Sequence, residues 1–251
     1  MKVKYSISLM VAAVVLLALS IPVHASKMDD QIVSSAKKSY AFKNYLKGDD
    51  IKIQSKDGAV TLTGTVSQES HKTLAQETVA GLRGVKTVDN RLEVKGESPT
   101  PNSDAWLMTK VKTTLLFHRS VSAGATEVDV KGGIVTLRGK AESQAQKDLT
   151  TEYAKDIDGV KDVKNEMVVS KPSKKTQTTG EKIDDASITG MAKMTLLYHR
   201  STSALNTSVK TNNGVVTLTG KAKSAAEKDL ATKYVKDVNG VKSVDNRMTI
   251  E

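Results

Sequence analysis

Alternation of apolar and polar residues recurs at three places along the chain, and each place predicts the same short strand. Val60 and Leu62 alternate with threonines, and the same alternation returns at 134–137 and at 215–218. A period of two is typical of a strand with one buried face and one solvated face. A DG, GG or NG pair stands just before each strand and predicts a tight hairpin to an earlier strand.

Helical periodicity surrounds each of these hairpins. Before the second hairpin, Leu107, Val111 and Leu115 fall on one side of a helix at about 100° per residue. After it, Ser143-x-x-Gln146 fits a capping box, in which two side chains bind backbone groups of the first helical turn. A last strand completes the unit. Each unit is therefore predicted to be α-β-β-α-β, an α+β fold with two helices on one face of a three-stranded sheet.

Three sets of residues recur at matching places in the units. In each unit one glycine stands 20 residues before a second, and an asparagine follows six residues after that. We predict a turn role for the first glycine and a left-handed conformation that ends the second helix for the second. The asparagines are predicted to be buried amides that tie down a neighbouring loop. The sets are Gly64, Gly139 and Gly220; Gly84, Gly159 and Gly240; and Asn90, Asn165 and Asn246.

The spacing of these sets divides the chain into three domains. The linkers between them are rich in Pro, Ser, Thr and Lys, a composition typical of flexible segments. The domains are placed at 28–96, 104–170 and 183–251, with linkers at 97–103 and 171–182.

The first 25 residues are not part of any unit. Two lysines precede an apolar run at 7–19, and the sequence VHA at 23–25 has the small-residue pattern of a cleavage site. These features predict a cleaved signal peptide at 1–25. No cysteine follows the apolar run, so we expect a soluble periplasmic protein without a lipid anchor.

The positive net charge favours an acidic partner. The distribution of this charge, however, is not typical of a dedicated nucleic-acid-binding protein. The formal net charge of +10 becomes +8 without the two lysines of the signal peptide. This excess is spread over the units and the linker at 171–182, without one dense basic face. We therefore expect no nucleic-acid partner.

Together, the apolar, glycine and asparagine positions resemble those of a known family. The second unit reads DAWLMTKVKTTLL, then the hairpin VDVKGGIVTLRG, then GVKDVKNEMVV, and the other units carry the same framework. This pattern is similar to that of the BON domain. The resemblance implies a protein of the cell envelope with a role in osmotic or envelope stress. It implies no enzymatic activity. We also expect no cofactor and no small-molecule substrate.

Two functions are compatible with this resemblance. The first is binding to an anionic phospholipid membrane surface, which positive charge and the avidity of three domains would support. The second is chaperone-like protection of unfolded envelope proteins, whose extended segments could add to an open strand edge. The sequence leaves both open.

Candidate lipid-binding residues lie on the first helix of the second unit. On a helical projection Trp106 points about 160° away from the apolar stripe, near Lys110, and Phe117 falls close to the same direction. An indole beside an ammonium suits a membrane interface. We therefore predict Trp106, Lys110 and Phe117 as lipid-binding residues. The alternative is that Trp106 packs on a neighbouring unit and that Phe117 lies beneath the helix end.

A repeated phrase raises the possibility of catalysis. TLLFHRS at 114–120 returns as TLLYHRS at 195–201. His71, His118 and His199 share no position common to all three units, and no second donor accompanies them, so we expect no metal site. The histidines are predicted to be surface or helix-end residues, and His118 and His199 to lie at a helix C-terminus, where a cation meets the negative end of the helix dipole. No catalytic residue is predicted.

Overall fold

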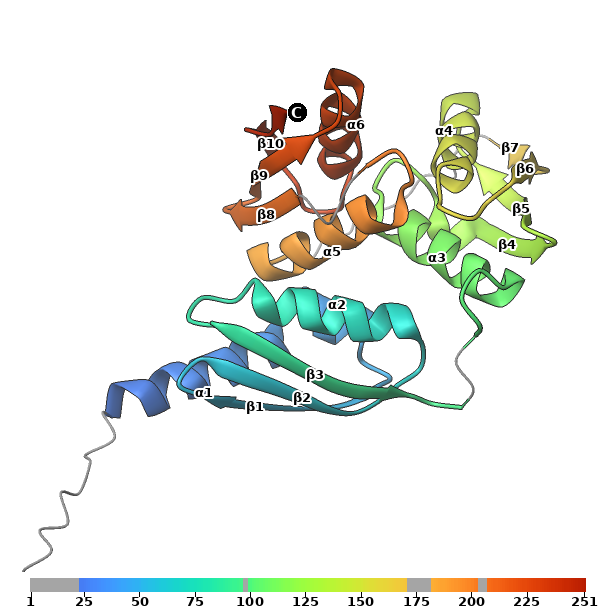
Figure 1. The fold of residues 1–251 in the computed structure, drawn as a ribbon. Helices are drawn as coiled ribbons and strands as arrows, with labels where there is room; N and C mark the ends of the chain where they lie inside the picture. Colours follow the sequence, from blue (N-terminus) through green and yellow to red (C-terminus); the bar gives the residue numbers. More distant parts are fainter. Residues whose placement is uncertain (1–22, 97–98, 171–181, 203–206) are drawn as a thin grey trace, which may run out of the picture.

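The computed structural model describes residues 23–96, 99–170, 182–202 and 207–251, with side chains from residue 27 onward. The expected signal peptide and basic linker therefore lie almost wholly outside the described residues. The described chain forms three domains that follow one another in sequence and touch one another in space (Figure 1). Each consists of two helices against one sheet, so the predicted α+β fold of three tandem domains is confirmed. Within these ranges no helix has the length and apolar character needed to span a bilayer.

Domain 1 is built around the central strand of its sheet. Strand β2 pairs antiparallel with β1 and parallel with β3, because a two-residue turn joins β1 to β2 whereas helix α2 makes the crossover to β3. The elements are α1 (Val23–Lys38), a π-helical turn (Ala41–Tyr45), β1 (Asp50–Lys56), β2 (Ala59–Val66), α2 (Glu69–Ala80) and β3 (Thr87–Val94).

Domains 2 and 3 repeat this order with the last strand interrupted. Its two pieces both pair in parallel with the central strand of their sheet. Domain 2 holds α3 (Asp104–Phe117), a 3-10 turn (Ala123–Ala125), β4 (Thr126–Lys131), β5 (Ile134–Ala141), α4 (Gln144–Lys155), β6 (Asp162–Asn165) and β7 (Val168–Val169). Domain 3 holds α5 (Asp185–Tyr198), β8 (Thr207–Asn212), β9 (Val215–Ala222), α6 (Ala225–Lys236), β10 (Ser243–Asn246) and β11 (Thr249–Ile250).

Local sequence patterns account for the core and the helix starts. Val135 and Leu137 of β5 are fully buried, and the threonine between them is only half-buried on the other face. At the start of α4, the Gln146 N–H donates to Ser143 Oγ at 3.1 Å, and Gln146 Oε1 accepts from the Glu142 N–H at 2.8 Å. The Ser143 cap is therefore present, the reciprocal bond from Gln146 reaches the N–H one residue before the cap, and the strand faces the core as its alternation predicts.

Two recurring glycines of domain 2 are required by close approach of other atoms. Gly139 has a φ of +117°, and a Cβ there would lie 2.0 Å from the Ala125 carbonyl oxygen. Gly159 has a φ of +95°, and its Cβ would lie 2.7 Å from Leu107 Cδ2 on α3. The prediction that Gly159 ends the helix is wrong, because α4 already ends at Lys155 and Gly159 shapes the turn that follows. The counterparts with positive φ are Gly64, Gly84, Gly220 and Gly240.

The recurring asparagines join the last strand of each domain to its second helix. Asn165 Nδ2 donates to the Lys147 carbonyl oxygen at 2.9 Å and to Thr151 Oγ1 at 2.8 Å. Its Oδ1 accepts from the Met167 N–H at 3.0 Å. The sequence predicts a buried amide that ties down a loop, whereas Asn165 is only half-buried and its donors reach the helix α4 instead. Corresponding bonds are made by Asn90 and Asn246.

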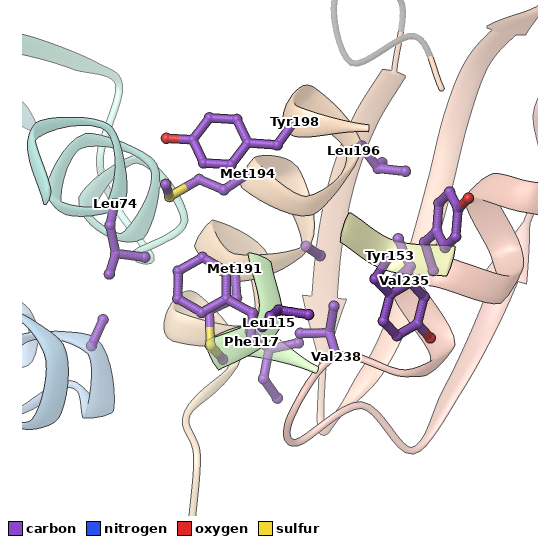
Figure 2. Close-up of a cluster of buried hydrophobic side chains, with 14 of the residues drawn as sticks. Leu74, Leu115, Phe117, Tyr153, Met191, Met194, Leu196, Tyr198, Val235 and Val238 are labelled. Atoms are coloured by element: carbon purple, nitrogen blue, oxygen red, sulfur yellow. The ribbon is translucent and has the colours of Figure 1, made fainter. Parts of the chain in front are cut away.

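The cores of the three domains are joined. Helix α2 lies along α5 (Figure 1), and small residues let the two helices approach closely, since a Cβ on Gly190 would lie 2.8 Å from Thr78 Oγ1. Figure 2 shows buried side chains of α2, α3, α4, α5 and α6 gathered in one cluster. The described domains therefore share one continuous hydrophobic core, although each also has its own sheet.

We expect Gly139→Ala to destabilise the protein by about 2 kcal/mol or more, because the new Cβ meets a backbone oxygen and strains a positive φ. Gly124→Ala is the matched control, since no atom lies within 4 Å of a Cβ placed there. Chemical denaturation of both variants measures the difference in the free energy of unfolding. Equal, small losses at the two positions would contradict the steric role of Gly139.

Candidate functional site

The three residues predicted to bind lipid do not form an exposed patch. Phe117 is only 1% exposed, and its ring centre lies 5.4 Å from that of Tyr45 in domain 1. The prediction that Phe117 faces outward is wrong, because the neighbouring domains cover the end of α3. Projection of one isolated helix cannot include those neighbours.

Lys110 and Trp106 contact each other instead of solvent. Lys110 is 8% exposed, and its Nζ lies 3.9 Å from the centre of the Trp106 ring and 5.3 Å from that of Tyr198 on α5. Burial lowers the pKa of Lys110, and the Asp158 carboxylate, 3.9 Å away, opposes that shift. The prediction that Lys110 is free to bind a headgroup is therefore wrong. Trp106 is half-buried and packs against the core.

An exposed leucine does lie on α3, one turn away from an exposed lysine. Leu116 is 43% exposed, at the edge of a groove between α3 and β4. Lys112, Leu115 and Val128 line the same groove. Lys112 has no ion-pair partner among the described residues. The sequence did not predict that Leu116 and Lys112 would line one exposed groove. A helical projection places both residues beside the apolar stripe, where it does not distinguish exposed from buried side chains.

The matching groove of domain 3 has a different electrostatic character. Leu197 is 46% exposed, much like Leu116. Lys193, however, has its Nζ 2.7 Å from Glu77 Oε2 of α2, so the cation is paired with an anion of domain 1. Glu77 and Thr73 of domain 1 also line this groove. Domain 1 therefore covers part of the groove and neutralises its lysine.

The two helix-end histidines are buried between domains 2 and 3. His118 and His199 are 2% and 1% exposed, so the surface alternative is wrong, whereas the predicted position at a helix C-terminus is confirmed. Each follows the last residue of a first helix, and that helix end packs against the end of the second helix of the other domain. We call this contact the junction, made by 117–120 with 233–239 and by 198–201 with 152–158.

At the junction a carboxylate of domain 3 accepts bonds from domain 2. Asp237 Oδ2 accepts from Tyr153 Oη at 2.8 Å, Oδ1 accepts from the Ser120 hydroxyl, and Oδ2 lies 3.3 Å from His118 Nδ1. The main chain contributes as well, since the Arg119 N–H donates to the Asp237 carbonyl oxygen at 3.0 Å. A desolvated carboxylate requires donors of this kind.

A carboxylate of domain 2 accepts the corresponding bonds from domain 3. Asp156 of domain 2 accepts from Tyr234 Oη at 2.8 Å and from the Ser201 hydroxyl, and its Oδ2 lies 3.2 Å from His199 Nδ1. The junction therefore has approximate two-fold symmetry. Burial alone would raise the pKa of Asp156 and of Asp237, but the bonds from histidine, serine and tyrosine outweigh it and hold both pKa values below the usual one.

Four aromatic rings fill the centre of the junction. His118 stacks on Tyr153, and His199 stacks on Tyr234, each pair with ring centres 4.0 Å apart. The two stacks meet edge to face, with 5.9 Å between the two imidazoles and 5.8 Å between the two phenols. We call these residues the four-ring cluster. Burial raises the pKa of both tyrosines, so they remain neutral donors.

One ion pair departs from this symmetry. Glu152 of α4 and Lys233 of α6 occupy matching positions in their domains, and Lys233 Nζ lies 3.1 Å from Glu152 Oε2 across the junction. Two copies of domain 2 in this arrangement would place glutamate against glutamate, and two copies of domain 3 would place lysine against lysine. The charges therefore favour pairing of domain 2 with domain 3.

Domain 1 lacks the residues that make the junction. Lys43, Thr78 and Gly81 stand where domain 2 has His118, Tyr153 and Asp156. A signal in the sequence could have identified the junction. The histidine, tyrosine and aspartate occur together in the second and third units, and all three are replaced in the first.

The junction brings acid–base groups together, but it is closed to a substrate. Both imidazole side chains have 0% exposure, and the carboxylates are occupied by donors of the facing domain. In the part of the chain that the structure describes, no group of three or more potential metal ligands occurs. The arrangement is suited to holding two domains together rather than to catalysis.

Comparison with known proteins agrees with this architecture. The sequence profile of the family described as "BON domain" matches residues 28–96, 103–171 and 184–251. The chain is 31% identical to "Osmotically-inducible protein Y" of Escherichia coli (strain K12) over 145 residues, which are 56% of this chain and 72% of that protein. It is 33% identical to "Outer membrane lipoprotein DolP" of Haemophilus influenzae (strain ATCC 51907 / DSM 11121 / KW20 / Rd) over 109 residues, 43% of this chain and 56% of that one.

A solved structure of CdsD, a structural protein of the type III secretion system of Chlamydia trachomatis, is also similar to this chain. It matches 90% of this chain and 92% of its own length at 15% identity. The TM-score of 0.24 is too low for any argument to rest on this similarity.

We expect Asp237→Ala to destabilise the protein by about 3 kcal/mol, because it leaves donors of domain 2 buried without an acceptor. The matched control is Asp245→Ala, which removes an exposed carboxylate paired with Arg247 and should cost at most about 1 kcal/mol. Denaturation at pH 7 measures both losses.

The effect of Asp237→Ala should also depend on pH. Because the pKa of Asp237 is lower in the folded than in the unfolded chain, its contribution is present above about pH 4 and is lost as the pH falls further. A difference between wild type and variant that persists unchanged to pH 2 would contradict the ionic role of this carboxylate.

Proposed function

This chain belongs to the BON domain family, and on that premise we propose that it acts in the cell envelope by binding anionic phospholipid surfaces. The names of two relatives support the setting, since one is osmotically inducible and the other is an outer membrane lipoprotein. The proposed activity is binding rather than catalysis and involves no cofactor. A net charge of +8, after removal of the two signal-peptide lysines from +10, favours an acidic surface.

The observation that carries this proposal is the pairing of Leu116 with Lys112 on the surface of α3. An exposed leucine can enter the boundary between headgroups and acyl chains, while an ammonium four residues earlier meets lipid phosphate. Each lysine near an anionic leaflet contributes about 1 kcal/mol. Because no carboxylate of the described residues is paired with Lys112, its charge is available to a membrane.

Domain 2 is better suited to this contact than domain 3. The leucines are similarly exposed in the two domains, but Lys193 is paired with Glu77, and α2 of domain 1 lines the groove of domain 3. A membrane would have to displace that ion pair before it could bind Lys193. The proposed contact therefore involves one groove, on domain 2.

A second candidate function is protection of unfolded envelope proteins. Val168 and Val169 of β7 are 64% and 43% exposed, and in the described residues β7 pairs only with β5. An extended segment of an unfolded protein could add to this edge by main-chain hydrogen bonds, with its side chains against the two valines.

The membrane proposal predicts salt-sensitive binding that depends on the groove of domain 2. Mature protein should co-sediment with vesicles of phosphatidylglycerol and phosphatidylcholine, more weakly at high salt, and far less with phosphatidylcholine alone. The double variant Lys112→Glu/Leu116→Ser should weaken this binding about tenfold or more, because it reverses one contributing charge and removes the apolar contact.

A matched control separates the groove from general attraction. Lys164→Glu/Val168→Ser makes the same charge reversal and replaces an exposed valine, also four residues further on, on the sheet of domain 2, and should leave binding within about twofold. Equal losses in both variants would contradict the groove, and equal binding to both vesicle types would contradict the function. Emission of the single tryptophan, Trp106, should change little on binding because its indole already packs on Lys110.

The chaperone candidate predicts a different outcome without vesicles. Mature protein at equimolar ratio should slow aggregation of an unfolded outer-membrane β-barrel protein, and Val168→Lys/Val169→Lys should abolish that effect. Lys112→Glu/Leu116→Ser, which leaves β7 intact, is the matched control and should protect like the wild type. No protection by the wild-type protein would exclude this candidate.

A further inference from the structure

Two histidines face each other inside the junction. His118 extends from the end of α3 and His199 from the end of α5, and each side chain has 0% exposure. Their ring centres are 5.9 Å apart. A histidine is the side chain whose ordinary pKa, about 6.5, is closest to neutrality, so its burial at a domain contact makes that contact sensitive to mild acid.

The surroundings of the ring nitrogens suit the neutral form, and within the described ranges only His199 Nδ1 makes a hydrogen bond, to Asp156 Oδ2. Nδ1 of each ring faces a carboxylate, at 3.3 Å for His118 and 3.2 Å for His199. Nε2 of each ring is buried and has no hydrogen-bond partner among the described residues. Protonation would place an N–H on this second nitrogen, without an acceptor and with a full charge, in a site that excludes water.

The charged groups around each ring act in both directions. His199 faces Asp156 at the end of α4, Tyr234 of α6, His118 of α3 and the neighbouring Arg200. The carboxylate favours protonation, whereas the second imidazole and the guanidinium oppose it. Burial is the largest effect and lowers the pKa of His199, with Asp156 opposing the shift and His118 adding to it.

His118 has the equivalent surroundings. It faces Asp237 at the end of α6, Tyr153 of α4 and His199 of α5, and it is followed by Arg119. Across the same junction Lys233 is paired with Glu152, so this ion pair adds little net charge. The His118 ring therefore lies in the same buried site as His199, 5.9 Å from it between ring centres.

The direction of the pH effect follows from proton binding. In a released junction His199 would be solvated, with a pKa near its ordinary value of about 6.5, so the released state binds more protons than the closed state below that pH. The closed state is fully favoured above about pH 6.5 and loses its advantage as the pH falls, by up to about tenfold per pH unit for this histidine. The carboxylates are affected separately, below about pH 4, because their pKa values are lowered.

We propose that the junction between domains 2 and 3 is a pH-sensitive latch, closed near neutrality and loosened in mild acid by protonation of His199, which is buried against Asp156, Tyr234 and His118. Loosening exposes the ends of α3, α4, α5 and α6, which the closed junction removes from solvent. Domain 1 stays attached to α5 through α2, since that contact contains none of the junction histidines. The inference concerns the junction alone and does not depend on which partner the protein binds.

Hydrogen exchange of the backbone amides that donate across the junction tests the latch. These amides belong to Arg119, Asp158, Arg200 and Asn239. Their protection factors, corrected for the intrinsic pH dependence of exchange, should fall several-fold, by up to about eightfold, between pH 7 and pH 5.5. Protection in the sheets, for example at Leu137, should stay constant over this range.

Variants assign the effect to histidine. His118→Gln/His199→Gln keeps a side-chain donor for each carboxylate but does not titrate, so its junction protection should be the same at pH 7 and pH 5.5. The matched control His71→Gln changes a histidine of domain 1 and should behave like the wild type. If the junction amides of the double variant are already unprotected at pH 7, the test uses the wild-type protein alone. Its loss of amide protection must then follow the titration of His199 observed by NMR.

Three results would overturn the proposal. The first is constant junction protection from pH 7 to pH 5. The second is a loss that begins only near pH 4, which would assign the effect to the carboxylates. The third is a loss that is unchanged in a folded, protected His118→Gln/His199→Gln variant.

Discussion

Asp156 and Asp237 lie largely out of solvent, where a carboxylate without donors would be strongly disfavoured, and the side chains that bind each of them belong to the other domain. Neither domain can satisfy its own aspartate. This requirement joins domains 2 and 3 and brings the ends of α3 and α5 together at the centre of the molecule. The position of domain 1 depends on the same arrangement, because α2 packs along α5, whose end is held in the junction (Figure 1).

Two-fold symmetry explains why three copies of one fold use two kinds of interface. An interface in which each partner offers the same surface is complete once two copies are paired, so a third copy cannot join it. Domain 1 accordingly has Thr78 and Gly81 where a junction would require tyrosine and aspartate. Thr78 and Gly81, which are small residues, also lie against α5. Thr78 is close to Gly190, and a Cβ on Gly81 would lie 3.3 Å from Ala186 Cα. Because Thr78 and Gly81 are small, domain 1 cannot form a second junction, but its helix α2 can pack closely along α5.

The sequence predicts the features that depend on near neighbours. One example is the strand alternation at Val135 and Leu137, and another is the cap formed by Ser143 and Gln146. Both involve residues within four positions of each other, so the sequence of one unit is enough to predict them. Phe117, Lys110 and the helix-end histidines were misplaced because the residues that cover them come from domains far away in the chain. A helical projection of one unit treats every residue off the apolar stripe as exposed, and that assumption fails where a domain has a second buried face.

Assembly also limits how such a protein can contact a membrane. Phe117 and the four-ring cluster are buried, and Trp106 is half-buried beside Lys110, so the aromatic anchors that usually hold a protein at an interface are not available. Domain 1 partly covers the groove of domain 3, which removes the avidity that three independent domains would supply. On the proposed function, attachment then rests on Lys112, Leu116 and the overall positive charge. Contacts of that size give weak, reversible and salt-dependent binding, which suits a protein that samples the membrane surface rather than one that stays anchored to it.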